Sequence, residues 1–134
     1  MRTKVVVVIA AVVLLASAGR VVAHHSFSAE FDASKPFKMT GTVTKVEWMN
    51  PHTYFYIDVT DEKTNKVVNW GMEMGSPNGL MRAGWTRNTM KAGDVVTVEG
   101  SLAKDGSPTG NARSVVLAKT GQRLFAASSQ GSTP

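Results

Sequence analysis

Thr42–Thr60 reads TVTKVEWMNPHTYFYIDVT, in which two β-rich segments flank the dipeptide Asn50-Pro51. Asn tolerates unusual backbone angles, and Pro fixes φ and lacks an N–H donor, so this dipeptide predicts a turn. In the second segment, apolar side chains alternate with polar and aromatic ones, which indicates a strand with one buried face. The predicted buried face carries Phe55, Ile57 and Val59, and the opposite face carries His52, Tyr54, Tyr56 and Asp58.

The segment before the turn predicts a bent first strand over Phe37–Trp48. Its apolar positions change parity midway, from Met39, Gly41 and Val43 to Val46 and Trp48. This change of phase near Thr44 predicts a β-bulge, because one extra residue switches the face on which later side chains lie. Closing a small barrel requires strands that bend in this way.

The remaining chain predicts a third strand over Lys66–Met74 and further strands over 95–102 and 111–118, with a short addition in 120–125. In the third strand we expect Val68, Trp70 and Met72 to face inward, and Asn69, Gly71 and Glu73 to face outward. A short helix after the third strand is predicted by Ser76 as N-cap, Pro77 at the first position and Gly84 at the exit, with Leu80 and Met81 packed inward.

The order of three strands, one helix and two or three strands predicts a mostly β protein. It matches the OB-fold, a five-stranded partly open barrel. We therefore predict a small five-to-six-stranded OB-like barrel with one short helix between strands three and four. A small sandwich of six or more strands is the alternative.

The N-terminus predicts a secretory signal peptide. Arg2 and Lys4 precede the apolar run Val5–Ala18, and small residues follow. This run is shorter than the ~20 residues that a membrane-spanning helix needs, although a retained anchor is the alternative. Cleavage fits after Ala18 or after Ala23. We favour Ala23, which would make His24 the first residue of the mature protein.

The composition bounds the class of protein. Removing residues 1–23 removes three of the 15 basic residues and lowers the net charge from +5 to +2, which does not argue for nucleic-acid binding. The chain has no cysteine, so export is accompanied by neither a disulfide nor a cysteine-linked lipid.

We expect a periplasmic or secreted protein without a membrane span in its mature form. The expected parts are a signal peptide (1–23), an N-terminal arm (24–36), a barrel domain (37–125) and a disordered tail (126–134).

The three histidines, His24, His25 and His52, suggest a metal site. After cleavage behind Ala23, His24 would offer its α-amine and its imidazole to one metal ion. A nitrogen from His25 or His52 would complete a nitrogen-only set suited to copper, zinc or nickel. Such a site is called a histidine brace and occurs with copper in oxidative enzymes and in copper carriers. The alternative is a polar chain start and a strand-edge His52 with a satisfied hydrogen bond.

An aromatic face is the second candidate site. Trp48, Tyr54 and Tyr56 lie on the first two strands, and the outer face of strands two and three is the usual ligand platform of an OB barrel. Aromatic rings there could stack on sugars or bases. Ordinary cross-strand pairing on a solvated face is the alternative. If the N-terminal arm folds over this face, the histidines and the tyrosines would form one site.

No sequence pattern indicates an enzyme. The carboxylates have no spacing that forces acid–base geometry, and neither a nucleophile elbow nor a phosphate-binding loop is present. We therefore expect a binding module for copper or a similar metal. The alternatives are a metal-free ligand- or protein-binding module, a copper oxidoreductase, and an accessory protein that contacts another envelope protein.

Several blocks of the chain resemble one family. Ala23–Phe27 (AHHSF), Gly41–Trp48 (GTVTKVEW) and Asn50–His52 (NPH) are similar to the domain-of-unknown-function family 6152 of small exported bacterial proteins. Later blocks that fit are Gly75–Asn78, Gly84–Arg87 and Gly110–Arg113. The resemblance implies an exported small β-barrel and carries no activity.

Overall fold

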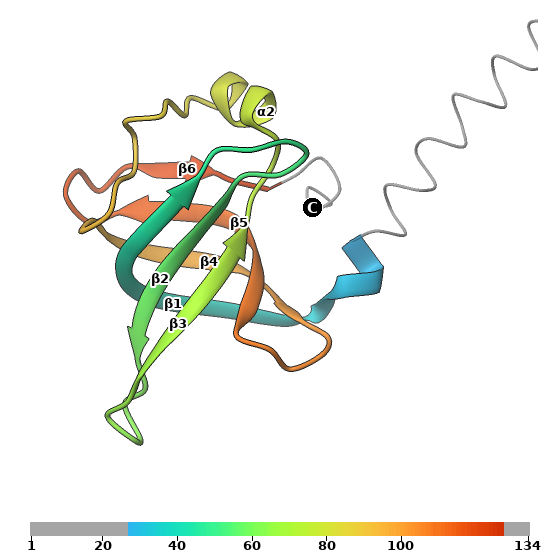
Figure 1. The fold of residues 1–134 in the computed structure, drawn as a ribbon, viewed down its shortest axis with the longest axis vertical. Helices are drawn as coiled ribbons and strands as arrows, with labels where there is room; N and C mark the ends of the chain where they lie inside the picture. Colours follow the sequence, from blue (N-terminus) through green and yellow to red (C-terminus); the bar gives the residue numbers. More distant parts are fainter. Residues whose placement is uncertain (1–26, 128–134) are drawn as a thin grey trace, which may run out of the picture.

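The computed structural model describes residues 27–127, and within them the chain forms six strands and a short helix (Figure 1). The strands are β1 (Phe31–Glu47), β2 (Tyr54–Thr60), β3 (Val67–Glu73), β4 (Val95–Ala103), β5 (Thr109–Leu117) and β6 (Arg123–Phe125). Helix α2 (Pro77–Arg82) lies between β3 and β4. Directly before β1, residues 27–30 form an N-terminal helical turn.

The strands form a nearly closed ring. β1 pairs antiparallel with both β2 and β4, β2 pairs with β3, and β4 pairs with β5. A short parallel pairing of β3 with β5 joins the two ends of this series, and β6 extends it beyond β5. The predicted OB-like barrel with a helix between the third and fourth strands is therefore confirmed, in place of the alternative sandwich.

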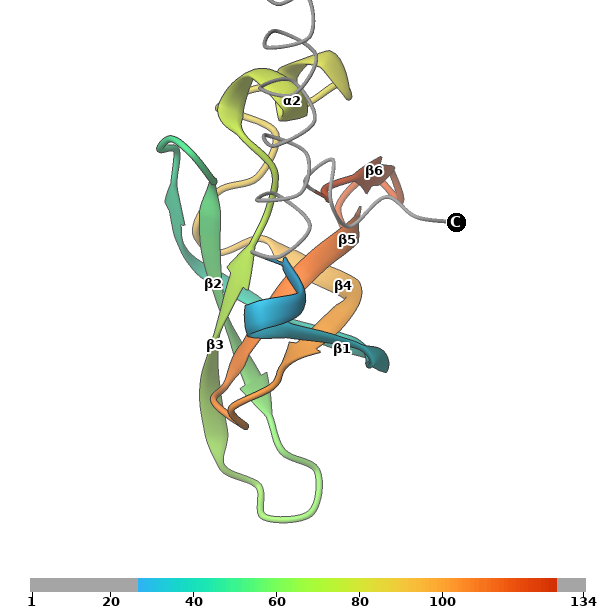
Figure 2. The same ribbon diagram turned by 90° about the vertical axis from the view of Figure 1, so that its right-hand side faces the viewer.

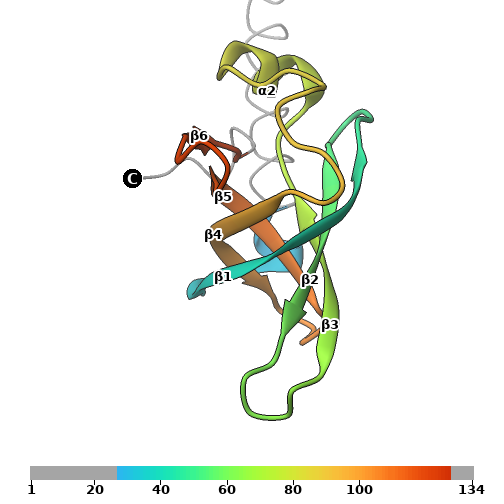
Figure 3. The same ribbon diagram turned by 90° about the vertical axis from the view of Figure 1, so that its left-hand side faces the viewer.

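Strand β1 belongs to both halves of the ring. Its first part pairs with β4 and its last part with β2, and Figure 3 shows it passing from one to the other. The register with β2 shifts between Val43 and Lys45, which confirms the predicted bulge. The prediction that this strand begins at Phe37 was wrong, because Phe31 already pairs with Ala103 and is buried. Residues 31–36, the last six of the expected arm (24–36), therefore belong to β1.

The turn between the first two strands is confirmed at Asn50-Pro51, whose peptide bond is cis. The alternation after it is also confirmed. Phe55 and Ile57 are fully buried, whereas Tyr54 and Tyr56 are half-buried on the opposite face. Apolar side chains from all five ring strands, from α2 and from the loop after α2 fill the interior.

Helix α2 begins as its sequence predicts. The backbone N–H of Gly79 donates to Oγ of Ser76 at 3.2 Å, and Pro77 occupies the first helical position. The prediction that Leu80 and Met81 both pack inward was half wrong. Leu80 is 1% exposed and Met81 is 53% exposed, because neighbouring residues on a helix point about 100° apart and a six-residue helix has one covered side.

The C-terminal end of the described chain packs on the barrel. Ala126 donates its N–H to the carbonyl oxygen of Arg113 and accepts a hydrogen bond from Gly75, and Ala126 and Ala127 are buried. The prediction that a disordered tail begins at residue 126 was therefore wrong. Residues 128–134 of that expected tail, and the predicted signal peptide, lie outside the described residues.

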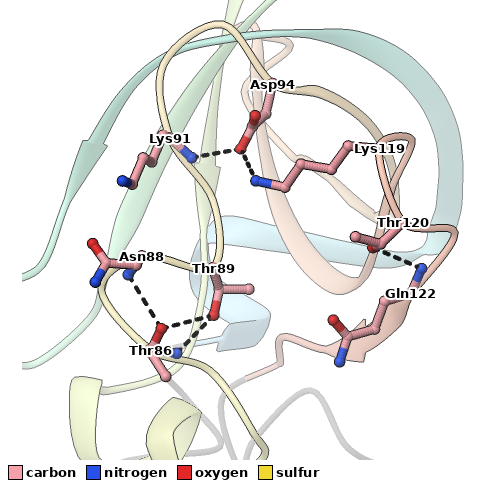
Figure 4. A network of polar contacts seen from close by, with 8 residues as sticks. All are labelled: Thr86, Asn88, Thr89, Lys91, Asp94, Lys119, Thr120 and Gln122. Atoms are coloured by element: carbon pink, nitrogen blue, oxygen red, sulfur yellow. Dashed lines mark hydrogen bonds and ion pairs between the residues drawn. The ribbon is translucent and has the colours of Figure 1, made fainter.

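A polar network connects the loops at one end of the barrel (Figure 4). Asp94 accepts hydrogen bonds from the backbone N–H of Lys91 at 2.8 Å and from Nζ of Lys119 at 2.9 Å. It thereby ties the segment before β4 to the turn after β5. Between residues 27 and 127, no helix is long and apolar enough to cross a membrane.

Candidate functional site

His52 lies between the cis-proline turn and β2, and backbone bonds fix its position. The N–H of Thr53 donates to the carbonyl of Gly75 at 2.9 Å, and the N–H of Met74 donates to the carbonyl of Thr53 at 2.8 Å. The His52 Nδ1 lies 3.1 Å from the carbonyl oxygen of Met74. A carbonyl can only accept, so the neutral ring carries its proton on Nδ1 and leaves the Nε2 lone pair available to a ligand.

Glu73 stands on the same side of this imidazole. Its Oε1 is 3.7 Å from Nδ1 of His52, and its Oε2 accepts a hydrogen bond from the Tyr54 hydroxyl at 3.2 Å. The carboxyl was expected to face solvent, yet Glu73 is only 9% exposed. Burial raises the pKa of Glu73, and the neighbouring His52 opposes that rise.

The N-terminal helical turn contributes to this environment. The charge of Glu30 adds to the rise in the pKa of both Tyr54 and Glu73. Figure 2 shows the turn in front of the sheet where β3 and β5 pass. The printed backbone contact of this turn is with the segment after β4, where the N–H of Lys104 donates to the carbonyl oxygen of Glu30 at 2.8 Å.

Tyr54 is held as a hydrogen-bond donor. Its burial, followed by the nearby charge of Glu73, raises the pKa of Tyr54 to about 12. The phenol therefore keeps its proton at any physiological pH, and that proton is directed to the Glu73 carboxylate.

A second Tyr–Glu pair lies one step along the same face. The Tyr56 hydroxyl donates to Oε2 of Glu47 at 3.2 Å. Lys45 forms an ion pair with Glu47, and its Nζ lies 5.9 Å from the centre of the Tyr56 ring. Hydrogen bonding to Lys45 lowers the pKa of Glu47. This pair therefore has a compensating cation.

The predicted aromatic platform forms only in part. Tyr54 and Tyr56 share one face of β2, but Trp48 packs against the hydrophobic core. Arg87 lies 5.8 Å from the Trp48 ring centre, and Lys45 covers Tyr56. The chain's own cations therefore approach two of the three rings proposed for stacking.

His52 also borders a cleft of about 560 Å³ beside α2. Ser76 and Arg82 line it from the α2 side, and Phe125 and Ala127 line it from the end of β6. An approach to the imidazole from this side is therefore open to a small ligand.

A protein-family model matches residues 11–113, and its description is "Family of unknown function (DUF6152)". The chain belongs to the DUF6152 family. The match runs through β1, β2, β3, α2 and β4 and ends within β5. Among curated proteins, no match to the chain was found.

In this DUF6152 chain, His24 and His25 lie outside the described residues, which begin at residue 27. Within residues 27–127, no group of three histidine or acidic side chains is placed to hold a metal ion. His52 is therefore the one predicted histidine whose surroundings are described.

The sequence did not identify Glu73 as part of the site, although the strand pattern could have predicted its position beside Tyr54. Tyr54 and Glu73 are direct partners in the register of the β2–β3 hairpin. Matching the predicted inward faces of the two strands, with Phe55 opposite Met72, would have placed Tyr54 opposite Glu73, whereas pairing Thr60 with Lys66 directly across the loop would have missed this register by one residue. The burial of Glu73 was not predictable in this way, because it depends on segments distant in the chain.

Proposed function

We propose that this DUF6152 protein is an exported, non-catalytic binding module that holds a transition metal, with copper as the first candidate. His24, His25 and His52 are the proposed ligands. The observation that carries the proposal is the hydrogen bond from His52 Nδ1 to the Met74 carbonyl. Ligating histidines in proteins commonly donate their second ring nitrogen to a carbonyl or carboxylate in this way.

The path of the chain supports a shared site. The charge of Glu30 acts on Tyr54 and Glu73, and Glu73 contacts His52. His25 precedes Glu30 by five residues. Five residues of fully extended chain span at most about 17 Å. In the proposed site, this reach of the chain brings His25 to the imidazole of His52.

The choice of metal follows from the donor atoms. An α-amine and imidazole nitrogens favour copper, nickel or zinc over magnesium or calcium, which prefer oxygen. The α-amine of His24 exists only if the signal peptide is removed behind Ala23. A protein that begins at Gly19 would bind the metal more weakly.

The test is a native intact-mass spectrum of the protein exported by its own signal peptide, with and without added copper. We expect a mass that begins at His24 and retains one copper ion. A copper titration should then show weaker binding for His52→Ala than for Asp58→Ala, a control that removes an exposed side chain of β2. Equal affinity in the two variants, or no retained copper in the wild type, would reject the proposal.

The alternative function is recognition of a metal-free ligand or an envelope protein by Tyr54, Tyr56 and Trp48. It is favoured by the placement of both tyrosines on one half-buried face. If copper is not retained, a pull-down in which the wild type captures a partner and the Tyr54→Ala/Tyr56→Ala variant does not would support it. Turnover of a copper-loaded protein with a reductant would instead indicate an oxidoreductase.

A further inference from the structure

We propose that Glu73 is the positioning residue of this metal site, and that Tyr54 holds Glu73 in place, so that Tyr54, Glu73 and His52 form one chain of contacts. The metal-binding consequence rests on the function proposed above. The effect of Glu73 on the His52 ring does not, because it follows from contacts in the metal-free protein.

The first step is the contact between carboxylate and imidazole. Oε1 of Glu73 lies 3.7 Å from His52 Nδ1, the nitrogen that also lies 3.1 Å from the Met74 carbonyl oxygen. Both oxygens favour a proton on Nδ1. In the neutral ring they favour the tautomer in which Nε2 holds the lone pair, the form in which an imidazole can ligate a first-row metal through Nε2.

The second step is the fixing of the carboxylate. Tyr54 donates to Oε2 of Glu73 at 3.2 Å, which leaves Oε1 toward the imidazole. Both residues lie within paired strands, where the backbone is fixed by the sheet. Sites supported by strands hold their side chains more closely than sites on loops.

The third step is that the contacts of Glu73 do not explain its burial as a contribution to folding stability. Among the described residues, Glu73 has no lysine or arginine partner; its ion-pair contact is with His52. The other groups that face it are the Tyr54 hydroxyl and the like charge of Glu30. A buried carboxylate with so little compensation costs stability. This cost is explained if the carboxylate serves to orient His52.

The Tyr56–Glu47 pair is a matched control within the same chain. It has the same hydroxyl-to-carboxylate distance of 3.2 Å and comes from the same part of the sheet. Its carboxylate pairs with Lys45. The variants Glu47→Gln and Tyr56→Phe therefore repeat the chemical changes of Glu73→Gln and Tyr54→Phe on a pair with a different ionic partner.

The experiment records the tautomer of His52 by long-range ¹H–¹⁵N NMR on the exported chain without metal, with His52→Ala to assign the signals. The wild-type ring should carry its proton on Nδ1. In Glu73→Gln the amide can donate to Nδ1, so the share of the Nε2–H tautomer should rise. Tyr54→Phe, which keeps the carboxylate, should give a smaller shift in the same direction, and both control variants should match the wild type.

Copper titration of the same set of proteins gives the second readout. Glu73→Gln should weaken binding about 10- to 100-fold, and Tyr54→Phe should weaken it several-fold. An unchanged tautomer in Glu73→Gln, or equal losses of affinity in the control variants, would overturn the positioning role. If the wild type binds no copper, the proposed function fails; a tautomer shift in Glu73→Gln would then still support the control of His52 by Glu73.

Discussion

The Tyr54 hydroxyl donates to Oε2 of Glu73 at 3.2 Å, and the two residues are direct partners across β2 and β3. Tyr56, on the same face of β2, donates over the same distance to Glu47 of the neighbouring strand β1. The surroundings differ, because Glu73 is buried and Glu47 has Lys45 beside it. Burial raises the pKa of Glu73, and the hydrogen bond from Lys45 lowers the pKa of Glu47.

Replacing Glu73 by Gln should stabilise the metal-free protein at neutral pH. The pKa of Glu73 is raised above its ordinary value of 4.5 in the folded state, so the folded state binds more protons than the unfolded state in the window above that value. Stability therefore falls as the pH rises through this window. Urea unfolding at pH 4 and pH 7 should therefore show that the stability of the wild type relative to Glu73→Gln is lower at pH 7 than at pH 4.

The same experiment has an internal comparison. Glu47→Gln should not stabilise the protein at pH 7, because that change removes the partner of Lys45. A Glu73→Gln variant that is less stable than the wild type at pH 7 would show that the hydrogen bond from Tyr54 outweighs the cost of burial.

Replacing Asp94 by Asn should reduce stability at neutral pH by less than ~1 kcal/mol, the usual range of solvent-accessible ion pairs. Hydrogen bonds from the Lys119 side chain and the Lys91 backbone lower the pKa of Asp94 below its ordinary value of 3.8 (Figure 4). The contribution of Asp94 is thus present above pH 3.8 and is lost as the pH falls through the lowered pKa. Thermal unfolding between pH 2 and pH 7 measures it.

The control for Asp94 is Glu62→Gln, which alters an exposed carboxyl in the β2–β3 loop. We expect the difference between the two variants to shrink at low pH and in high salt. A difference that persists unchanged at pH 2 would mean that Asp94 does not act through its charge.

Gly100→Ala should destabilise the protein by at least about 2 kcal/mol. A Cβ at this position would lie 1.9 Å from the backbone oxygen of Asn111, at the register shift between β4 and β5. Backbone has to move to relieve that contact. Gly71→Ala is the matched control, since its Cβ would meet only the Tyr56 ring, at 3.3 Å. Equal urea midpoints for the two variants would contradict the prediction.

Trp85→Phe should cost about 2 kcal/mol of stability, from lost volume in the core and a lost hydrogen bond. Trp85 is buried, and its Nε1–H donates to the carbonyl of Phe125 at 2.9 Å. The bond attaches β6 to the loop after α2. Trp48→Phe, at a half-buried position, should cost less. Circular dichroism during urea unfolding compares them, and equal losses would argue against a special role for Trp85.

Features that depend on neighbouring residues were readable from the sequence. The alternation around Ile57 follows from the two-residue period of a strand, and the bulge near Thr44 follows from a change in that period. The cap at Ser76 follows from the N–H groups left without partners at a helix start. Each of these signals lies within a few residues of the structure that it predicts.

Features that depend on distant segments were mispredicted or missed. Pro36 suggested the end of an arm, yet β1 begins at Phe31 because Ala103 of β4 pairs with it. Ala126 looked like part of a polar tail, yet it bonds to Gly75 and Arg113. In both cases the partner lies far away along the chain, so no local pattern indicates it.

Glu73 illustrates the same division at the candidate site. Alternation correctly assigned its side chain to the outer face of β3, together with Tyr54 on β2. Whether an outward side chain meets water depends on what else lies over that face. Here His52, from the segment before β2, contacts Glu73, and the charge of Glu30 in the N-terminal helical turn also acts on it. The period of a strand specifies a direction, whereas burial and pKa are set by non-local packing, and these made Glu73 a candidate for function.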